Sequence, residues 1–192
     1  MYTLVTILTE GTLRVYQKMK NKIWKEAALE KLAGRGKLGK ETAEYIRRKG
    51  VRIHFKKYAK STGARWFFFQ QISLNTHYYS PDKKIDDPKI LSLLVHEIHH
   101  LKQGALTALS VYGELDAWQV EFRFYKEIYP VKLHSALEEI LTLPLNYDRD
   151  NLRRAAKLMQ DYAGKGYHSN WLPFYPLHRE ILYWVTRMKP KS

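Results

Sequence analysis

Cysteine is absent from this chain of 192 residues, which excludes disulfide scaffolds, thiol nucleophiles and cysteine-based zinc fingers. The chain also lacks an uninterrupted apolar run of about 18 residues, so we expect neither a membrane-spanning helix nor a membrane partner. Its first residues carry no basic segment and reach Glu10 too early for a signal peptide. Hydrophobic residues still make up 45% of the chain, enough for a sizeable core. Together these features predict a folded cytoplasmic protein.

Acidic residues are scarce relative to basic ones. The chain has 33 Lys and Arg against 19 Asp and Glu, a net charge of +14. Residues 1–60 hold 16 of the basic residues against five Glu, so this segment alone carries +11. A positive potential of this size attracts polyanions. The segment is therefore a candidate nucleic-acid-binding surface.

Two helices and a strand are predicted in the first 50 residues. Residues 2–9 are rich in Thr, Leu, Val and Ile and predict a short strand. An apolar stripe among lysines predicts a helix over Tyr16–Leu32. The GxGxxG spelling at residues 34–39 lacks the strand–turn–helix context of a dinucleotide site, so we expect a flexible basic loop. A short helix is predicted over Lys40–Lys49.

The next part of the chain has the patterns of a small sheet. Val51–Phe55 alternates apolar and polar residues, and Arg65–Asn75 is rich in aromatic and β-branched residues. A turn is expected between them at Ser61–Ala64. We interpret the two segments as a hairpin in a small antiparallel sheet, to which the strand at residues 2–9 is a candidate addition.

Helical patterns dominate beyond residue 80. The predicted helices run from Asp86 or Asp87 to Gln103, over Val111–Tyr129, from Asp148–Asp150 to Gly164, and from Pro176 to before Pro190. The whole order predicts an α+β fold, with the sheet of the N-terminal half packed on a helical C-terminal half. We expect one compact domain with three regions: a basic region at 1–50, a core at 51–129 and a helical subdomain at 130–192.

The helix after Pro88 carries the string His96-Glu97-Ile98-His99-His100, which is an HExxH motif. Residues four apart on a helix differ by about 40° and about 6 Å, so both outer imidazoles can reach one ion at about 2.0–2.1 Å. Glu97 follows the first histidine, where its carboxylate can take a proton from water without ligating the metal. His99 points about 100° away from His100. We therefore expect it to face solvent or to contact a metal ligand without binding the metal itself.

The alternative without a metal is that His96 and His100 are ordinary histidines hydrogen-bonded to Glu97 and nearby backbone. The context favours a metal site. The motif lies inside a well-capped helix, and apolar residues such as Leu94 and Ile98 give that helix a wide buried surface.

A catalytic zinc typically takes three protein ligands, and without cysteine the third must be His, Asp or Glu. The next predicted helix offers three carboxylates, which we rank in the order Glu114, Glu121 and Asp116. The small Ala117 between them would let this helix approach the histidine helix closely. Glu121 and Asp116 are also candidates to hold a ligand imidazole by its other nitrogen. The alternative is that these are solvated acids, favoured near a helix N-terminus.

His96-Glu97-x-x-His100 followed by Glu114-x-x-Ala117 resembles the gluzincin metallopeptidases, and the size of the chain is most similar to the compact minigluzincins. The resemblance covers about residues 51–129. It implies zinc bound by His96, His100 and a downstream Glu, and hydrolysis of peptide bonds in a peptide or protein substrate by water that zinc and Glu97 activate. One position departs from the family: Trp118 stands where many members have Asp.

Two further features of the family follow from the resemblance. Gln71–Asn75 suits the edge strand that binds extended substrate. A Tyr or His commonly supplies a hydrogen bond to the developing oxyanion. The candidates for that donor are Tyr147, Tyr167 and His168, and the sequence does not choose among them.

Three other interpretations compete with a zinc metallopeptidase. The first is a nucleic-acid-binding basic protein in which the motif is incidental. The second is a SprT-like protease acting on DNA-bound proteins, although no cysteine-bearing zinc module of the kind often attached to those proteases is present. The third is a zincin fold that keeps its metal for structure.

Overall fold

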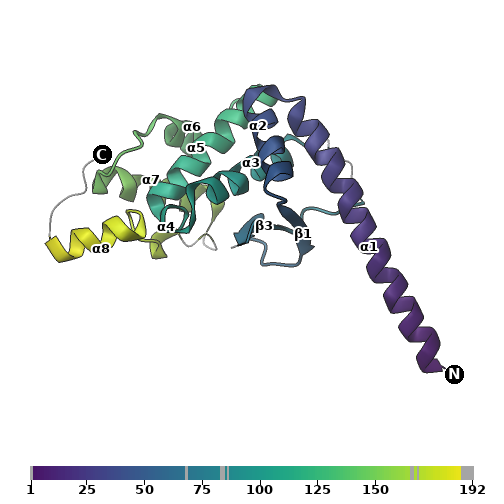
Figure 1. Ribbon diagram of the computed structural model, residues 1–192. Helices are drawn as coiled ribbons and strands as arrows, with labels where there is room; N and C mark the ends of the chain where they lie inside the picture. Colours follow the sequence, from purple (N-terminus) through teal and green to yellow (C-terminus); the bar gives the residue numbers. More distant parts are fainter. Residues whose placement is uncertain are drawn as a thin grey trace.

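A computed structural model describes residues 2–67, 69–82, 85, 87–164, 167 and 169–186 (Figure 1). The elements are α1 (Tyr2–Ala33), α2 (Gly36–Arg48), β1 (Arg52–Lys56), β2 (Ala64–Phe67), β3 (Gln71–Asn75), α3 (Pro88–Gln103), α4 (Ala105–Ala108), α5 (Val111–Ile128), α6 (Ser135–Thr142), α7 (Arg149–Ala163), the 3-10 helix η1 (Ser169–Trp171) and α8 (Leu177–Thr186). The predicted α+β arrangement is confirmed: a small sheet lies in the N-terminal half and helices form the rest.

The sheet is mixed, so the prediction of a purely antiparallel sheet is wrong. Its strand order is β1-β3-β2, with β1 parallel and β2 antiparallel to β3. The segment 65–75 does not form one strand, because the chain reverses at Phe69 and Gln70, which both have positive φ. The hairpin therefore joins β2 to β3, and β1 enters beside β3 instead of pairing with residues 65–67.

The predicted strand at residues 2–9 and the predicted loop at 34–39 are also wrong. Helix α1 begins at Tyr2, so the helix predicted over residues 16–32 extends through residues 2–9 as well. Helix α2 begins at Gly36, two residues after Gly34. Gly39 is buried against α1, and a Cβ there would lie 2.2 Å from the carbonyl oxygen of Leu32. This glycine thus permits close packing of two helices rather than loop flexibility.

The capping signals of α3 act as predicted. The Asp87 side chain accepts a hydrogen bond from the Lys89 backbone N–H, Pro88 occupies the first turn, and the helix ends at Gly104, whose φ is +76°. Helices α5, α7 and α8 lie within their predicted ranges, although the predicted end of the last one falls outside the described residues. The short helices α4 and α6 were not predicted.

Two apolar clusters form the core, and they meet at α3 and α5. One joins α1, α2, the sheet and α3, and includes the buried Leu29, Ile72 and Leu94. The other joins α5, α6 and α7, and includes the buried Leu115 and Leu152. Figure 1 shows α3 and α5 near the middle of the molecule, and their many contacts make them a packed pair. No helix in the described part of the chain is both long and apolar enough to cross a membrane.

Candidate metal centre

Two buried histidines of α3 face α5, and the buried Glu97 lies beside them. His96, Glu97 and His100 are each less than a tenth exposed, and their helix is buried on most of its surface. The apolar residues around them, such as Leu94 and Ile98, are what bury the helix. Burying three ionisable groups costs folding free energy unless they have hydrogen-bond or charge partners. The groups around them therefore indicate what the site can bind.

The carboxylate of Glu114 on α5 completes a group of three ligand atoms. The Nε2 atoms of His96 and His100 lie 2.9 Å apart. Glu114 Oε1 is 3.4 Å from His100 Nε2, and Glu114 Oε2 is 3.9 Å from His96 Nε2. Ligand atoms about 2.0–2.1 Å from a tetrahedral zinc lie about 3.3–3.4 Å apart. Two imidazoles and a carboxylate at this spacing fit the donor set and the size of a zinc site.

Glu97 adds a second observation that fits a metal site. Its Oε2 atom is buried without a hydrogen-bond partner among the described residues, and the side chain borders the same cleft as His96 and Glu114. Burial raises the pKa of its carboxyl group. A buried carboxylate oxygen that lacks a partner beside an opening is suited to a water or substrate group.

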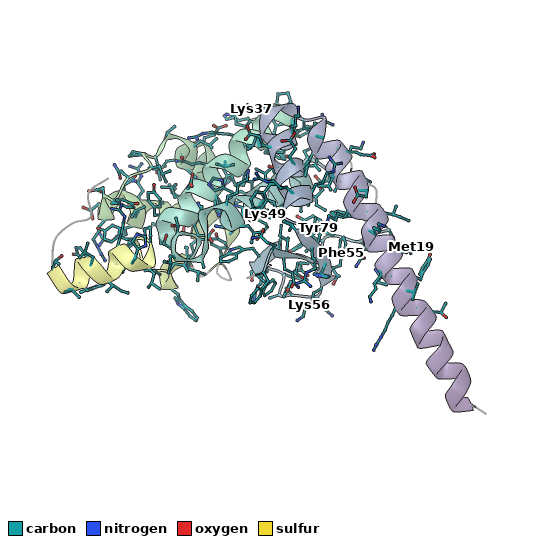
Figure 2. The ribbon with its side chains drawn as sticks, viewed as in Figure 1. Met19, Lys37, Lys49, Phe55, Lys56 and Tyr79 are labelled. Carbon is teal, nitrogen blue, oxygen red and sulfur yellow. The ribbon has the colours of Figure 1, made fainter. Side chains whose placement is uncertain are left out.

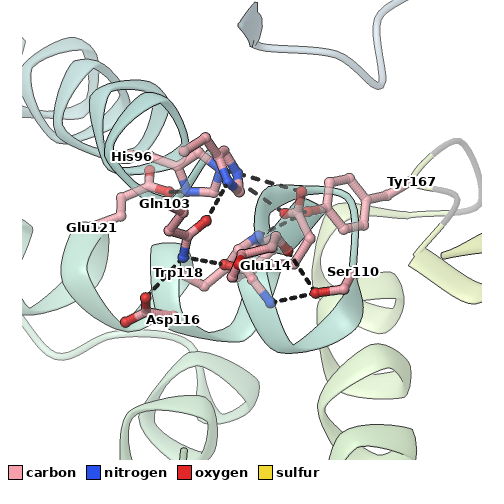
Figure 3. A network of polar contacts seen from close by, with 11 residues as sticks. His96, Gln103, Ser110, Glu114, Asp116, Trp118, Glu121 and Tyr167 are labelled. Carbon is pink, nitrogen blue, oxygen red and sulfur yellow. Dashed lines mark hydrogen bonds and ion pairs between the residues drawn. The ribbon is translucent and has the colours of Figure 1, made fainter. Parts of the chain in front are cut away.

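Each histidine is held by its other ring nitrogen (Figure 3). Glu121 Oε2 lies 2.9 Å from His96 Nδ1, although off the line of a linear hydrogen bond. Gln103 Oε1 lies 3.1 Å from His100 Nδ1, and its Nε2 donates to Asp116 Oδ2 at 2.8 Å. These contacts leave both Nε2 atoms turned toward Glu114. Such outer contacts fix the ring orientation that metal binding requires.

The charges of the site are strongly coupled. Burial alone would lower the pKa of His96, but Glu121, Glu97 and Glu114 outweigh it and raise that pKa to about 9. Burial likewise opposes the charged form of Glu114, yet His100 and His96 and the Tyr167 hydroxyl lower its pKa to about 2. Without metal, the carboxylate is therefore ionised and helps to stabilise a proton on His96. A dication would replace that proton.

Tyr167 reaches Glu114 from the C-terminal part of the chain. Its hydroxyl donates a hydrogen bond to Glu114 Oε2 and accepts one from Trp118 Nε1 at 2.9 Å. Trp118, the departure from the gluzincin pattern, thus holds Glu114 through Tyr167. Figure 3 shows the tyrosine ring approaching the cluster from the side opposite His96 and Glu121.

The remaining predicted residues lie elsewhere. Asp116 does not join the three ligand atoms; its Oδ2 lies 2.6 Å from His99 Nε2, and His99 therefore faces α5 beside the cluster. Tyr147 packs against the ring of Tyr112 at 4.6 Å and is not among the residues of the cleft. His168 lies outside the described residues.

Gln103 is the contributor that sequence reasoning missed. It lies three residues after His100, which places the two side chains on the same face of α3. This three-residue spacing could have indicated from the sequence that Gln103 contacts His100.

A cleft of about 630 Å³ opens beside the cluster and is bordered by His96, Glu97 and Glu114. The predicted edge strand, Gln71–Asn75, is the central strand of the sheet, so that expectation is wrong. The edge next to the cleft is β2: Ala64 and Arg65 border the opening, and the Trp66 ring lies 5.9 Å from that of His100.

Comparisons with protein-family models, with curated proteins and with solved structures found no match for this chain. Its chemistry therefore has to be inferred from the site itself. A His–His–Glu cluster with a buried glutamate and an adjacent cleft can bind a divalent metal and bring water to a substrate carbonyl.

Replacing Gln103 by alanine should lower zinc affinity by about 10- to 100-fold, because the His100 ring would lose the contact that orients it. The measurement is competition with a chromophoric chelator. Gln17→Ala, on the exposed face of α1, is the matched control and should bind zinc like the parent chain. Unchanged affinity in Gln103→Ala would show that the His100–Gln103 contact does not support metal binding.

Proposed function

We propose that the protein is a zinc-dependent metallopeptidase. The observation that carries the proposal is the convergence of His96, His100 and Glu114 beside a buried Glu97 whose carboxylate lacks a partner within the described chain. In such a site zinc supplies Lewis acidity, lowering the pKa of water and polarising a carbonyl oxygen. His96, His100 and Glu114 would hold the ion.

Glu97 is the general base of this proposal. It lies on α3 one residue after His96, and its buried carboxylate accepts the proton of the attacking water. The pKa of its carboxyl group is raised by burial, which strengthens it as a base and lets it pass the proton to the leaving amine.

Strand β2 and the cleft wall would bind the substrate. Within the described sheet β2 pairs only with β3, so its other edge can accept an extended peptide by β-augmentation. The wall beyond the cluster is rich in apolar and aromatic side chains: Tyr79, Leu93, Phe122, Tyr125, Leu133, Leu137 and Tyr162. We therefore expect cleavage next to a bulky apolar residue.

The test is metal content followed by peptide cleavage. Protein purified without chelator should contain about one zinc per chain, and zinc should raise the melting temperature of the stripped protein. The zinc-loaded protein should cleave a mixed peptide library, and mass spectrometry should identify an apolar residue beside the cleaved bond. If stripped protein neither binds zinc nor shifts its melting temperature, the proposal is wrong.

Tyr167 is the donor that we assign to the oxyanion, because of the three candidates it is the one that the structure places at the cluster. Its single O–H would turn from Glu114 to the oxyanion when substrate binds. Tyr167→Phe should lower kcat by about 10²–10³-fold and change zinc affinity less than about tenfold. Tyr147→Phe is the matched control and should leave both unchanged, since Tyr147 lies outside the cleft. A parallel fall of zinc affinity and activity in Tyr167→Phe would instead mean that the hydroxyl only positions Glu114.

A further inference from the structure

Helix α1 extends well beyond the rest of the molecule (Figure 1). Among the side chains of α1 that the structure describes, those in the core begin at Trp24 and include Leu29 and Leu32. Residues 11–19 are all exposed. Helices in proteins gain most of their stability from tertiary packing, and Gly11 further weakens this stretch. The apolar side chains of this stretch that the structure describes, such as Val15 and Met19, therefore belong to neither core cluster.

An exposed apolar stripe runs along the projecting stretch and just beyond it, made by Val15, Tyr16, Met19 and Ile23. Their exposed fractions are 67%, 49%, 52% and 62%. Their spacing of three and four residues places them on one face of the helix. At about 100° per residue, that face is roughly opposite to the one that buries Leu32. Figure 2 shows Met19 on the part of α1 that extends past the sheet.

Lysines line both edges of the stripe. Lys18 and Lys22 are exposed along one edge, and Lys20, which contacts Asp82, lies along the other over the Tyr16 ring. A second copy of the helix on this stripe would bring lysines against lysines, and like charges at such a seam are costly. The complementary partner is therefore anionic as well as apolar.

We propose that the stripe docks on the surface of an anionic lipid bilayer. Helices that bind in the plane of a membrane interface combine an apolar face with lysines that contact anionic headgroups, as this stretch of α1 does. Nucleic acid offers phosphates but no apolar layer to cover Val15, Met19 and Ile23, so it explains only half of the surface. A helix lying in the interface does not need the length or apolarity of a spanning one.

The test is cosedimentation of the full chain with phosphatidylcholine vesicles that contain or lack phosphatidylserine. We expect binding to the anionic vesicles that weakens with salt, and at least about tenfold weaker binding to neutral ones. Val15→Ser/Met19→Ser/Ile23→Ser should weaken binding at least about tenfold. Lys18→Glu/Lys22→Glu should weaken binding to anionic vesicles by a similar factor and leave the weak binding to neutral vesicles unchanged.

Two matched variants make the result specific. Ile181→Ser/Val185→Ser removes exposed apolar residues from α8, and Lys40→Glu/Lys49→Glu makes the same charge change at exposed lysines of the α2 region. Both should bind vesicles like the parent chain, and circular dichroism should show all variants folded. The proposal is overturned if the parent ignores anionic vesicles, or if the triple variant binds them equally well. Two other results would also overturn it. In one, the stripe variants lose self-association, measured by sedimentation velocity, but still bind vesicles. In the other, they lose binding to a DNA duplex but still bind vesicles.

Discussion

Glu97→Gln is expected to lower kcat for peptide hydrolysis by about 10²–10⁴-fold while zinc stays bound. The amide keeps the size of the side chain but cannot accept a proton at neutral pH. The ligand atoms of His96, His100 and Glu114 are untouched by the change, and the parent Oε2 has no hydrogen-bond partner to lose among the described residues. Activity on a fluorogenic peptide and zinc content per chain, measured on the same sample, check both halves of the expectation.

The matched control is Glu44→Gln, an exposed position on α2 that should change neither quantity. Full activity in Glu97→Gln would exclude Glu97 as the base. Loss of zinc together with activity would mean instead that Glu97 supports the metal, as in a zincin fold that keeps its ion for structure.

His100→Ala should weaken zinc binding by at least about a hundredfold, since one of three ligands is removed. The zinc affinity of the neighbouring variant His99→Ala is the matched control. His99 contacts Asp116 and lies outside the group of three ligand atoms, so its loss should change zinc affinity by less than about tenfold. Chelator competition measures the affinities.

The two variants also separate metal binding from stability. A zinc excess of 100 times the dissociation constant stabilises the folded state by about 2.7 kcal/mol, which should raise the melting temperature of the parent and of His99→Ala. His100→Ala should show no such shift at the same zinc concentration. Equal zinc affinities for the two alanine variants would contradict the proposed ligand set.

The histidine helix could be predicted closely because its determinants are local. Asp87 and Pro88 start it, Gly104 ends it, and the four-residue spacing of His96 and His100 puts both rings on one face. The strand at residues 2–9 was wrong because these eight uncharged residues suit either element, and in the structure α1 continues through them from the helix predicted after residue 16. The pairing of β1 with β3 was missed for a related reason: strand partners are not local in sequence.

By itself, the sequence determined the composition of the site: two histidines four residues apart, a glutamate between them and no cysteine. It left open which acid of the next helix faces them. Glu114, Asp116 and Glu121 all lie on α5. The rotation of α5 about its axis depends on how its apolar side chains divide between the two core clusters, with Phe124 packed beside α3 and Leu115 packed on α6 and α7. That packing brings Glu114 to both Nε2 atoms, sends Glu121 to His96 Nδ1 and leaves Asp116 with His99. Only the tertiary structure could make this choice, because it depends on the fit of two helix surfaces and not on spacing along either one.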